Sequence, residues 1–519
     1  MDEINTNNQS NNYNAEQTSK DMSRVRYFLT GCLIYSCFYT FCMYKNPSGI
    51  TYPVLVLATI IVFRLFTKKR FDDAAGLFPP SCRFYEISCL LLGVSTCATD
   101  CIPVIFLNKT AVFLLMLLYF INALFDTSKC NFIQHISAAL NVIFGTLGCL
   151  LNPFRDYKWY KNASAYLKGL GIDDAAARRD GFFVRNKTMI RNIALGLMVA
   201  FPLLAVIITL LRSADVLFDE MFGSIFEVIF DFHIADWISD LFANLFGIVF
   251  MTAAAFIVSY AVWSFLGRRS INESTAKEGT FEPVTAITFT GLLAVVYVMF
   301  SFIQIFGLFL GNMKLPDNYT YAEYARQGFF QLLFVCILNI IIVLVCLYCF
   351  KKSNILKALL TVISVCTYIM TASSAMRMIM YIRAYRLTFL RIAVLWGLTL
   401  IAVIITGILI YIYNKNFRLF RYCVVWTTVL YIAFSYSHPD LISAAYNFEH
   451  INLSKPKNDI TYILELSDDA APVTMSSDFK EFCASSGYRM TYKYYTQEKR
   501  EPAGIRTFNL SRFIAYIMQ

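Results

Sequence analysis

The stretch that decides the fold is NYTYAEYARQGFFQLLFVCILNIIIVLVCLYCF, residues 318–350. Its second part, Leu332–Phe350, is almost wholly apolar and is long enough to cross a hydrocarbon core of about 30 Å as a helix. Its first part carries polar residues that a helix would place within about 140° of arc, since each residue turns by about 100°. These residues are Glu323, Arg326, Gln327 and Gln331. Ionisable groups at the mouth of a membrane helix are costly, so this stripe is a candidate functional site.

Composition extends the membrane interpretation to the whole chain. Of its 519 residues, 57% are hydrophobic and only 15% are charged, which is far too apolar for a soluble protein. Apolar runs of membrane-crossing length recur from residue 25 to residue 437, and we count about twelve. The sequence therefore predicts an all-α, polytopic membrane protein with about twelve transmembrane helices and a small C-terminal extramembrane appendage.

The net charge of +10 does not indicate nucleic-acid binding, because Lys and Arg cluster at the ends of apolar runs, where orientation in the bilayer explains them. Fifteen cysteines lie mostly inside apolar runs and are interpreted as packed or lipid-facing residues rather than a disulfide framework. The Cys346-x-x-Cys349 spacing occurs within a predicted span and has no second pair, so we interpret it as packing.

The apolar runs, the charge of the loops between them and the odd or even number of crossings between loops divide the chain into segments. The number of crossings in residues 84–152 stays open between two, three and four, because length favours three and the charge of the flanking loops favours an even number. The predicted segments are a disordered polar N-terminal tail at 1–24, N-terminal transmembrane helices at 25–152, a basic cytoplasmic loop at 153–187, central transmembrane helices at 188–266 with an acidic external segment at 212–239, a cytoplasmic linker at 267–282, C-terminal transmembrane helices at 283–437 and an extramembrane tail at 438–519.

The positive-inside bias places the N-terminus in the cytoplasm and, by parity, the tail after residue 437 outside. One external turn breaks this rule, because four arginines surround it and require an acidic partner or an anionic ligand. They are Arg377, Arg383, Arg386 and Arg391.

This sidedness brings polar residues of five segments to one membrane face. They could bind an anionic head group or solute, they could be interhelical glue, or they could couple to protons or ions. We expect Asp215 and Glu323 to be the first general-base candidates if the protein acts on a lipid-linked substrate. The predicted ligand-binding residues are Arg212, Asp215, Gln304, Glu323, Arg326, Gln327, Gln331, Arg377, Arg383 and Arg391.

Motifs for metal, nucleotide or acyl-transfer chemistry are missing from the sequence. The four histidines include no H-x-x-x-H or HExxH spacing, and no phosphate-binding loop or nucleophile-elbow motif occurs in a strand-to-helix context. His438, Asp440, Glu449 and His450 are close enough in sequence to suggest a divalent metal, although solvated polar residues explain them better. We therefore expect no catalytic residues of these kinds, no metal and no cofactor.

Three strings resemble a family of uncharacterised multi-spanning proteins of Gram-positive bacteria, the domain-of-unknown-function group numbered four-one-five-three and four-one-seven-three. The strings are Leu211–Phe218 (LRSADVLF), Tyr321–Leu332 (YAEYARQGFFQL) and Phe508–Arg512 (FNLSR). A fourth string, Tyr385–Arg391, resembles a family segment with glycine where Arg386 stands. The resemblance implies an integral protein of the bacterial cytoplasmic membrane and brings no established activity.

Function follows as a hypothesis with two alternatives. We expect a non-enzymatic protein that binds, senses or moves an anionic lipid or small solute through the external polar cluster. The alternatives are an assembly or signalling scaffold with protein partners at the tail, and a membrane-embedded transferase acting on a lipid-linked substrate. The lipid bilayer is the one partner that the composition itself requires, and the sequence does not give the oligomeric state.

Overall fold

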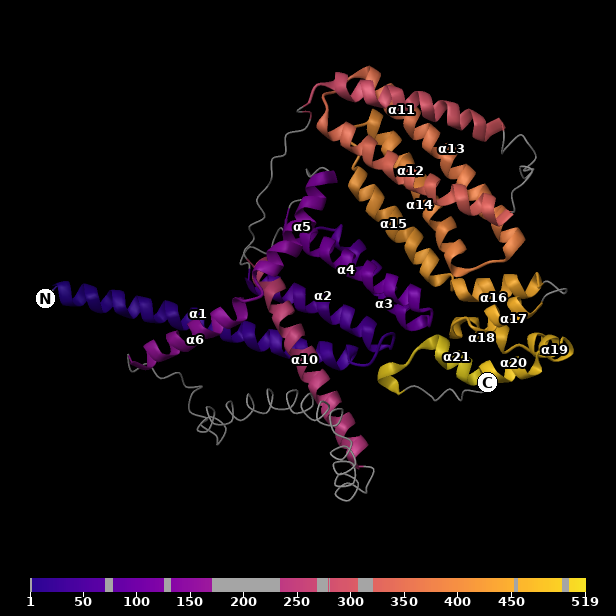
Figure 1. Ribbon diagram of the computed structural model, residues 1–519. Helices are drawn as coiled ribbons and strands as arrows, with labels where there is room; N and C mark the ends of the chain where they lie inside the picture. The colour runs from indigo at the N-terminus through magenta and orange to yellow at the C-terminus, as the bar shows by residue number, and fades with distance from the viewer. Residues whose placement is uncertain are drawn as a thin grey trace, which may run out of the picture. The chain divides into compact units, whose positions relative to one another are not determined.

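The computed structural model describes residues 2–70, 78–125, 132–169, 234–267, 279, 281–306, 321–451, 456–496 and 504–519. These residues form helices and their connections, together with one isolated parallel bridge between Phe281 and Phe350, in agreement with the predicted all-α class. The chain forms two compact units (Figure 1). They comprise residues 1–44 with 146–264 and residues 45–145 with 265–519.

The first unit is built from α1 (Asp2–Met43), α6 (Asn152–Gly169) and most of α10 (Ile234–Leu266). Buried Met22 of α1 packs against Ala163 and Leu167 of α6. The Tyr260 hydroxyl of α10 donates to Asp156 of α6 at 2.6 Å. Helix α1 begins inside the segment that composition predicts to be a disordered tail, and neither proline nor glycine precedes Gly31 to interrupt it.

The second unit contains two groups of long helices. The first group comprises α2 (Thr51–Arg70), α3 (Cys82–Ala98), α4 (Ile102–Leu124) and α5 (Phe132–Gly148), so residues 84–152 contribute three helices up to the start of α6. The second group comprises α11 (Pro283–Gln304), α12 (Tyr321–Cys349), α13 (Asn354–Tyr385), α14 (Phe389–Tyr413) and α15 (Leu419–Tyr436). Helix α13 packs against α11, α12 and α14, and its core includes the fully buried Leu360 and Ile363.

Buried polar side chains join α15 to the first group. Asn108 of α4 accepts hydrogen bonds from the Tyr431 hydroxyl at 2.8 Å and from the Ser435 hydroxyl at 2.7 Å. Ser435 also lies 2.6 Å from the Ser95 hydroxyl of α3. Polar side chains that bond each other between membrane helices hold those helices together, and this network does so for α3, α4 and α15.

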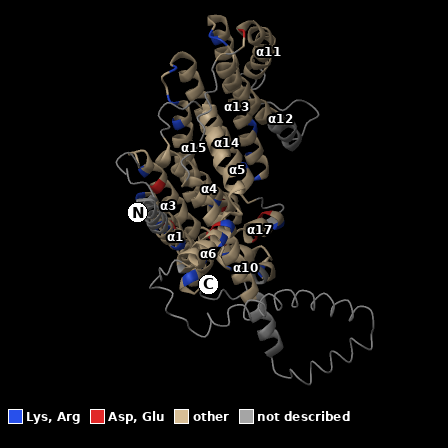
Figure 2. Ribbon diagram, turned by 90° about the vertical axis from the view of Figure 1, so that its left-hand side faces the viewer, with Lys and Arg blue, Asp and Glu red and all other residues tan. Residues whose placement is uncertain are grey.

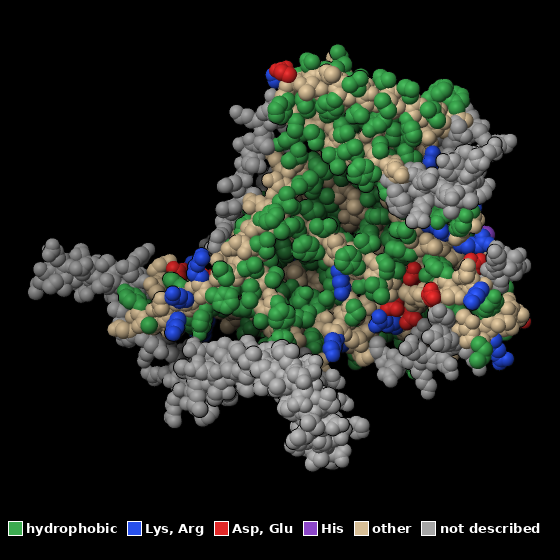
Figure 3. Space-filling model, in the orientation of Figure 1, with side chains coloured by type: hydrophobic (Ala, Val, Ile, Leu, Met, Phe, Trp, Pro, Cys, Tyr) green, Lys and Arg blue, Asp and Glu red, His purple; other side chains and the backbone are tan. Residues whose placement is uncertain are grey.

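Membrane-crossing helices are numerous but fewer than predicted in the part of the chain that the structure describes. Eight of its helices are long and apolar enough to cross a membrane, or nine if the bent pair Phe132–Gly148 and Asn152–Leu167 forms one span. Much of the predicted central transmembrane segment 188–266 lies outside the described residues, so the count of about twelve stays a prediction. Figure 2 marks few charged residues along α14 and α15, and Figure 3 shows hydrophobic side chains lining a hollow between α2–α4 and α11–α14.

The residues after α15 form a small helical appendage of the second unit. Its core contains Ala444, Ile460 and Phe479, each 0% exposed. The elements are α16 (Pro439–Glu449), α17 (Pro456–Leu464), η3 (Asp468–Ala470), α18 (Ala471–Thr474), α19 (Ser477–Ser485), α20 (Arg489–Thr496), η4 (Ile505–Thr507) and α21 (Leu510–Met518). Helix α16 contacts α14 and α18, and α21 contacts α18 and α3. The appendage therefore lies against the ends of the long helices.

Candidate functional site

The buried carboxylate of Asp469, in η3, joins the appendage to the turn between α3 and α4. Its side chain is 0% exposed. The Thr99 hydroxyl donates to Asp469 Oδ2 at 2.5 Å, and the Asp100 backbone N–H donates to Asp469 Oδ1 at 2.7 Å. A buried carboxylate is tolerated where donors surround it, and this one fixes the backbone that connects two membrane helices.

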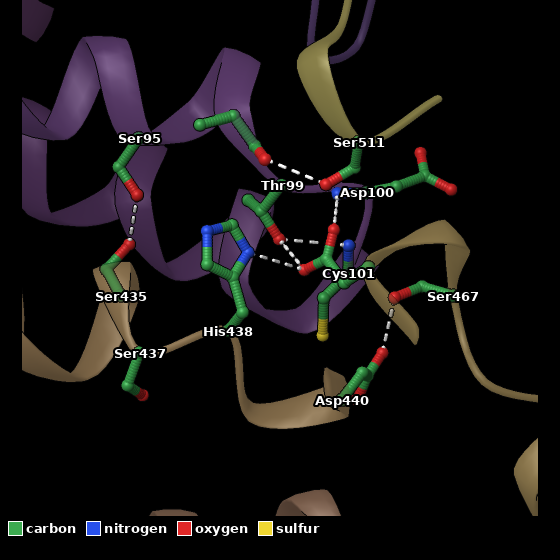
Figure 4. Close-up of polar contacts among 12 residues, drawn as sticks. Ser95, Thr99, Asp100, Cys101, Ser435, Ser437, His438, Asp440, Ser467 and Ser511 are labelled. Carbon is green, nitrogen blue, oxygen red and sulfur yellow. Dashed lines mark hydrogen bonds and ion pairs between the residues drawn. The ribbon is translucent and has the colours of Figure 1, made fainter. Parts of the chain in front are cut away.

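His438 approaches the same carboxylate from the connection between α15 and α16 (Figure 4). Its Nδ1 lies 3.3 Å from Asp469 Oδ2, and its side chain is 28% exposed. Because a carboxylate can only accept, Nδ1 carries the hydrogen and the neutral ring holds its lone pair on Nε2. No hydrogen-bond partner for Nε2 lies among the residues that the structure describes. The arrangement is therefore an imidazole oriented through Nδ1 by a buried carboxylate.

The backbone at His438 is in the left-handed region, with φ +48° and ψ +74°, immediately before Pro439. Left-handed conformations are uncommon outside glycine, and a following proline further restricts the backbone. Such conformations persist when surrounding contacts impose them, and they concentrate at functional sites. Here the contact with Asp469 and the proline that begins α16 hold the imidazole in place.

Electrostatics at this site favour opposite charges on the pair. Hydrogen bonding to Asp469 raises the pKa of His438, against the opposing effect of burial. Burial by itself would raise the pKa of Asp469, but hydrogen bonds from His438, Ser511, Thr99 and the Asp100 N–H together hold it below its usual value. An imidazolium and a carboxylate are thus the stabilised forms of the two groups.

Three further groups complete the acidic surroundings of His438. Asp440 is buried and accepts the Ser467 hydroxyl at 2.6 Å (Figure 4). Burial and the Asp440 carboxylate raise the pKa of the Cys101 thiol, so the thiol stays protonated. Burial raises the pKa of Asp100, although Arg512 Nε donates to its carboxylate at 2.7 Å. The site is therefore better suited to protons and proton donors than to free anions.

The pH dependence of stability should reveal this pair. His438 contributes stability that is fully present below its unfolded pKa of about 6.5 and is lost as pH rises through its raised folded value. We expect the melting temperature of the wild type in detergent to fall from pH 6 to pH 9 relative to that of His438→Gln. His450→Gln is the control, because His450 is exposed and stacks on Tyr446. Parallel curves for the wild type and His438→Gln would contradict this pairing.

The predicted ligand-binding residues fall partly within the described structure. Arg212 and Asp215 lie outside it. The backbone of Glu323, Arg326 and Gln327 belongs to the first turns of α12, as the helical stripe predicted, but the description does not extend to their side chains. Gln331, the last member of the stripe, is exposed.

Gln304 and Arg377, two of the predicted ligand-binding residues, are in contact. Gln304 Oε1, at the end of α11, accepts a hydrogen bond from Arg377 Nη2 of α13 at 3.2 Å and from the Ser373 hydroxyl at 2.6 Å. Arg377 is only 9% exposed. An amide oxygen thus orients a guanidinium that is buried among membrane helices.

The other arginines of the α13–α14 turn have separate roles. Arg386 forms an ion pair with Asp459 of α17, with Nε and Oδ2 3.6 Å apart. Arg391 caps the end of α13, because its Nη1 donates to the carbonyl of Tyr385 at 2.6 Å and also to that of Arg386. Arg383 is exposed at the same helix end.

Arg386 also occupies a backbone conformation that suits glycine, with φ +72° and ψ 178°. The turn thus adopts this conformation with arginine at the position. Residues other than glycine in this region cost about 1–3 kcal/mol. Arg386→Gly and Arg386→Ala both remove the contact with Asp459, but only alanine keeps the strain. We expect the glycine variant to be more stable than the alanine variant by about that amount in thermal or chemical unfolding, and equal stabilities would contradict the strain.

The suggested metal ligands do not converge. His438 and Asp440 bond to Asp469 and Ser467, and the His450 imidazole contacts the Tyr446 carbonyl. Within the described ranges, no group of three or more His, Cys, Asp or Glu side chains is arranged to hold a metal ion.

Sequence reasoning missed Thr99, Asp469 and Asn509, which hold the site together. Asn509 is 0% exposed and donates to the Thr99 carbonyl at 2.8 Å. It belongs to the Phe508–Arg512 string, which was the available signal that this segment matters. Asp469 carried no comparable signal, because its partners are distant in sequence.

The apolar helices, the buried polar contacts between them and the docked helical appendage define a polytopic α-helical membrane protein. Residues 87–476 match the model of the family described as Domain of unknown function (DUF4153). The chain belongs to this family. No curated protein and no solved structure matches it.

Proposed function

We propose that this protein binds an anionic lipid head group or a small anionic solute at the end of the bundle that carries Arg377, and thereby senses or moves it. The observation that supports this function is the buried guanidinium of Arg377, held by Gln304 within a helix apolar enough to cross a membrane. Ionisable side chains among membrane helices are costly and mark ligand or ion sites by default. A guanidinium offers planar paired donors that fit phosphate and carboxylate.

The charge around this helix end agrees with an anionic ligand. Arg383 and Arg391 lie at the same end of α13 and the start of α14. Arg386 is offset by Asp459, whereas the exposed Arg383 adds positive charge next to the bilayer surface. Positive potential at the mouth of a helix bundle raises the local concentration of anions.

Binding in reconstituted vesicles tests the proposal. Arg377→Gln removes the charge and keeps a polar side chain, and we expect about a tenfold loss of binding, or about 1.4 kcal/mol. Native mass spectrometry of phosphatidylglycerol retained against phosphatidylcholine reports a lipid ligand, and uptake of radiolabelled phosphate reports a solute. Arg418→Gln is the control, because Arg418 is exposed in the connection between α14 and α15 and is not part of the α13–α14 turn. Unchanged retention and uptake in a normally folded Arg377→Gln protein would contradict the function.

A membrane-embedded transferase is the second candidate, and the Asp469–His438 pair favours it. An imidazole oriented through Nδ1 by a carboxylate can accept a proton on Nε2 from the hydroxyl of an acceptor substrate. In this second candidate we take His438 as the general base in place of Asp215 or Glu323. With a polyprenyl-diphosphate-linked sugar as donor, we expect His438→Gln to abolish turnover without unfolding and His450→Gln to leave it unchanged. Turnover that persists in His438→Gln would exclude this base.

A further inference from the structure

Helix α21 presents an apolar outer surface although it belongs to the extramembrane appendage. Its buried side is narrow and consists of Ser511 and Ala515, with Ala515 packing against Ala471 and Met475. The outward residues cover about 200° of arc at 100° per residue and are nearly all hydrophobic. They are Leu510, Phe513, Ile514, Tyr516, Ile517 and Met518, which are 37–66% exposed.

Helix α19 of the same appendage shows what a water-facing helix looks like in this chain. It buries Phe479 and Cys483, and its outward side carries the exposed Asp478, Lys480 and Glu481. The two helices are equally short, at nine residues each, and both pack on the appendage by one side. The difference between their outer surfaces therefore indicates different surroundings, water for α19 and an apolar medium for α21.

The position of α21 identifies that medium. The Ile50 N–H, directly before α2, donates to the Phe508 carbonyl at 2.9 Å, and Asn509 donates to the Thr99 carbonyl at the end of α3. Helix α21 thus begins where α2 begins and α3 ends (Figure 1). The Ser511 hydroxyl also donates to the Ala98 carbonyl, the last residue of α3, at 2.8 Å.

The exposed stripe of α2 continues to the same point. Residues at helical spacing along α2 are exposed and apolar, as expected of a side that faces lipid. They are Ile50, Val54, Leu57, Ile61 and Leu65, at 40–61% exposure. Because Ile50 begins this stripe and bonds to Phe508, the lipid-facing surface of a membrane span meets the start of α21. An apolar helix at the end of a span lies at the boundary between head groups and acyl chains.

We infer that α21 lies in the membrane interface, with Phe513, Ile514 and Ile517 inserted among lipid acyl chains. Its partner is the bilayer itself. Arg512, between the buried and the apolar sides, is held by Asp100 at 2.7 Å and faces the head-group level. The appendage is then attached in two ways. The polar contacts of Thr99, Asp469 and Asn509 join it to the α3–α4 turn, and insertion of α21 joins it to the bilayer.

Photolabelling with lipid tests this placement on the full chain. The protein is reconstituted in vesicles of phosphatidylcholine and phosphatidylglycerol that contain a phosphatidylcholine with a diazirine in its acyl chain, then irradiated and digested with trypsin. We expect label on residues 513–519 at a level similar to residues 46–64, which include the exposed stripe of α2. Residues 481–489, which include most of α19, should stay unlabelled.

A variant with Phe513→Gln and Ile517→Gln leaves the buried side of α21 intact, so it should fold normally and lose the label on residues 513–519. Label on residues 513–519 no higher than on 481–489 in the wild type would overturn the inference. So would protection of 513–519 in a dimer that dissociates in the glutamine variant, because a second copy of the chain would then cover α21. The melting temperature of the glutamine variant is measured in parallel. If it equals that of the wild type, the loss of label reports lost insertion of α21 and not unfolding.

Discussion

Asp469→Ala is expected to lower the free energy of unfolding by roughly 3–5 kcal/mol, the range for breaking a buried charged pair. The carboxylate is 0% exposed and accepts from the Thr99 hydroxyl, the Asp100 N–H and the His438 imidazole. Alanine leaves these donors facing an apolar side chain, and the Thr99 hydroxyl is fully buried, whereas the imidazole is 28% exposed and can reach water. The melting temperature in detergent, followed by intrinsic fluorescence, measures the loss.

Two further substitutions separate charge from packing. Asp469→Asn keeps one acceptor oxygen and a similar volume, so its melting temperature should lie between those of the wild type and Asp469→Ala. For Asp478→Ala, on the exposed side of α19, the free energy of unfolding should stay within about 0.5 kcal/mol of the wild-type value. If Asp469→Ala melts like Asp478→Ala, the carboxylate does not hold the appendage to the α3–α4 turn.

The helices could be predicted because their signal is local. A run such as Leu332–Phe350 is apolar enough to specify a membrane helix whatever its neighbours do, and the structure has α12 there. Residues 84–152 contribute three helices, but the number of membrane crossings among them, which length and loop charge left open between two, three and four, stays a prediction. The helical appendage after residue 437 was also predicted. The apolar runs stop there, and the residues that follow are enough for a small appendage but too few for a large independent core.

The candidate site was predictable only where charge broke a local rule. The unusual number of arginines at the end of α13 drew attention to this segment, and the structure shows that Arg377 within α13 donates to Gln304 of α11. That Arg386 pairs with Asp459 depends on a contact across 73 residues, and no pattern in either segment encodes it. Asp469 and Thr99 are 370 residues apart, so their hydrogen bond exists only once the appendage has docked.

Asn509→Ala should detach α21 from the membrane helices and lower the free energy of unfolding by about 3 kcal/mol. The Asn509 amide donates to the Thr99 carbonyl at 2.8 Å and to the carbonyl and hydroxyl of Ser48 at 3.3 and 3.2 Å. Its Oδ1 accepts the Arg512 N–H at 3.2 Å and so caps α21. One fully buried side chain thus bonds to Ser48 before α2, to Thr99 after α3 and to the first turn of α21, and alanine can make none of these hydrogen bonds.

Asn509→Asp distinguishes the cap from the other contacts. Aspartate can still accept the Arg512 N–H but cannot donate to the Thr99 carbonyl, so it should keep α21 helical while losing most of the docking energy. Hydrogen exchange of amides in residues 510–518 should therefore accelerate in the alanine variant and less in the aspartate variant. Asn414→Ala, at an exposed residue whose side chain accepts the Asn416 N–H, is the control. Unchanged exchange in Asn509→Ala would mean that insertion of Phe513 and Ile517 into lipid suffices to hold α21.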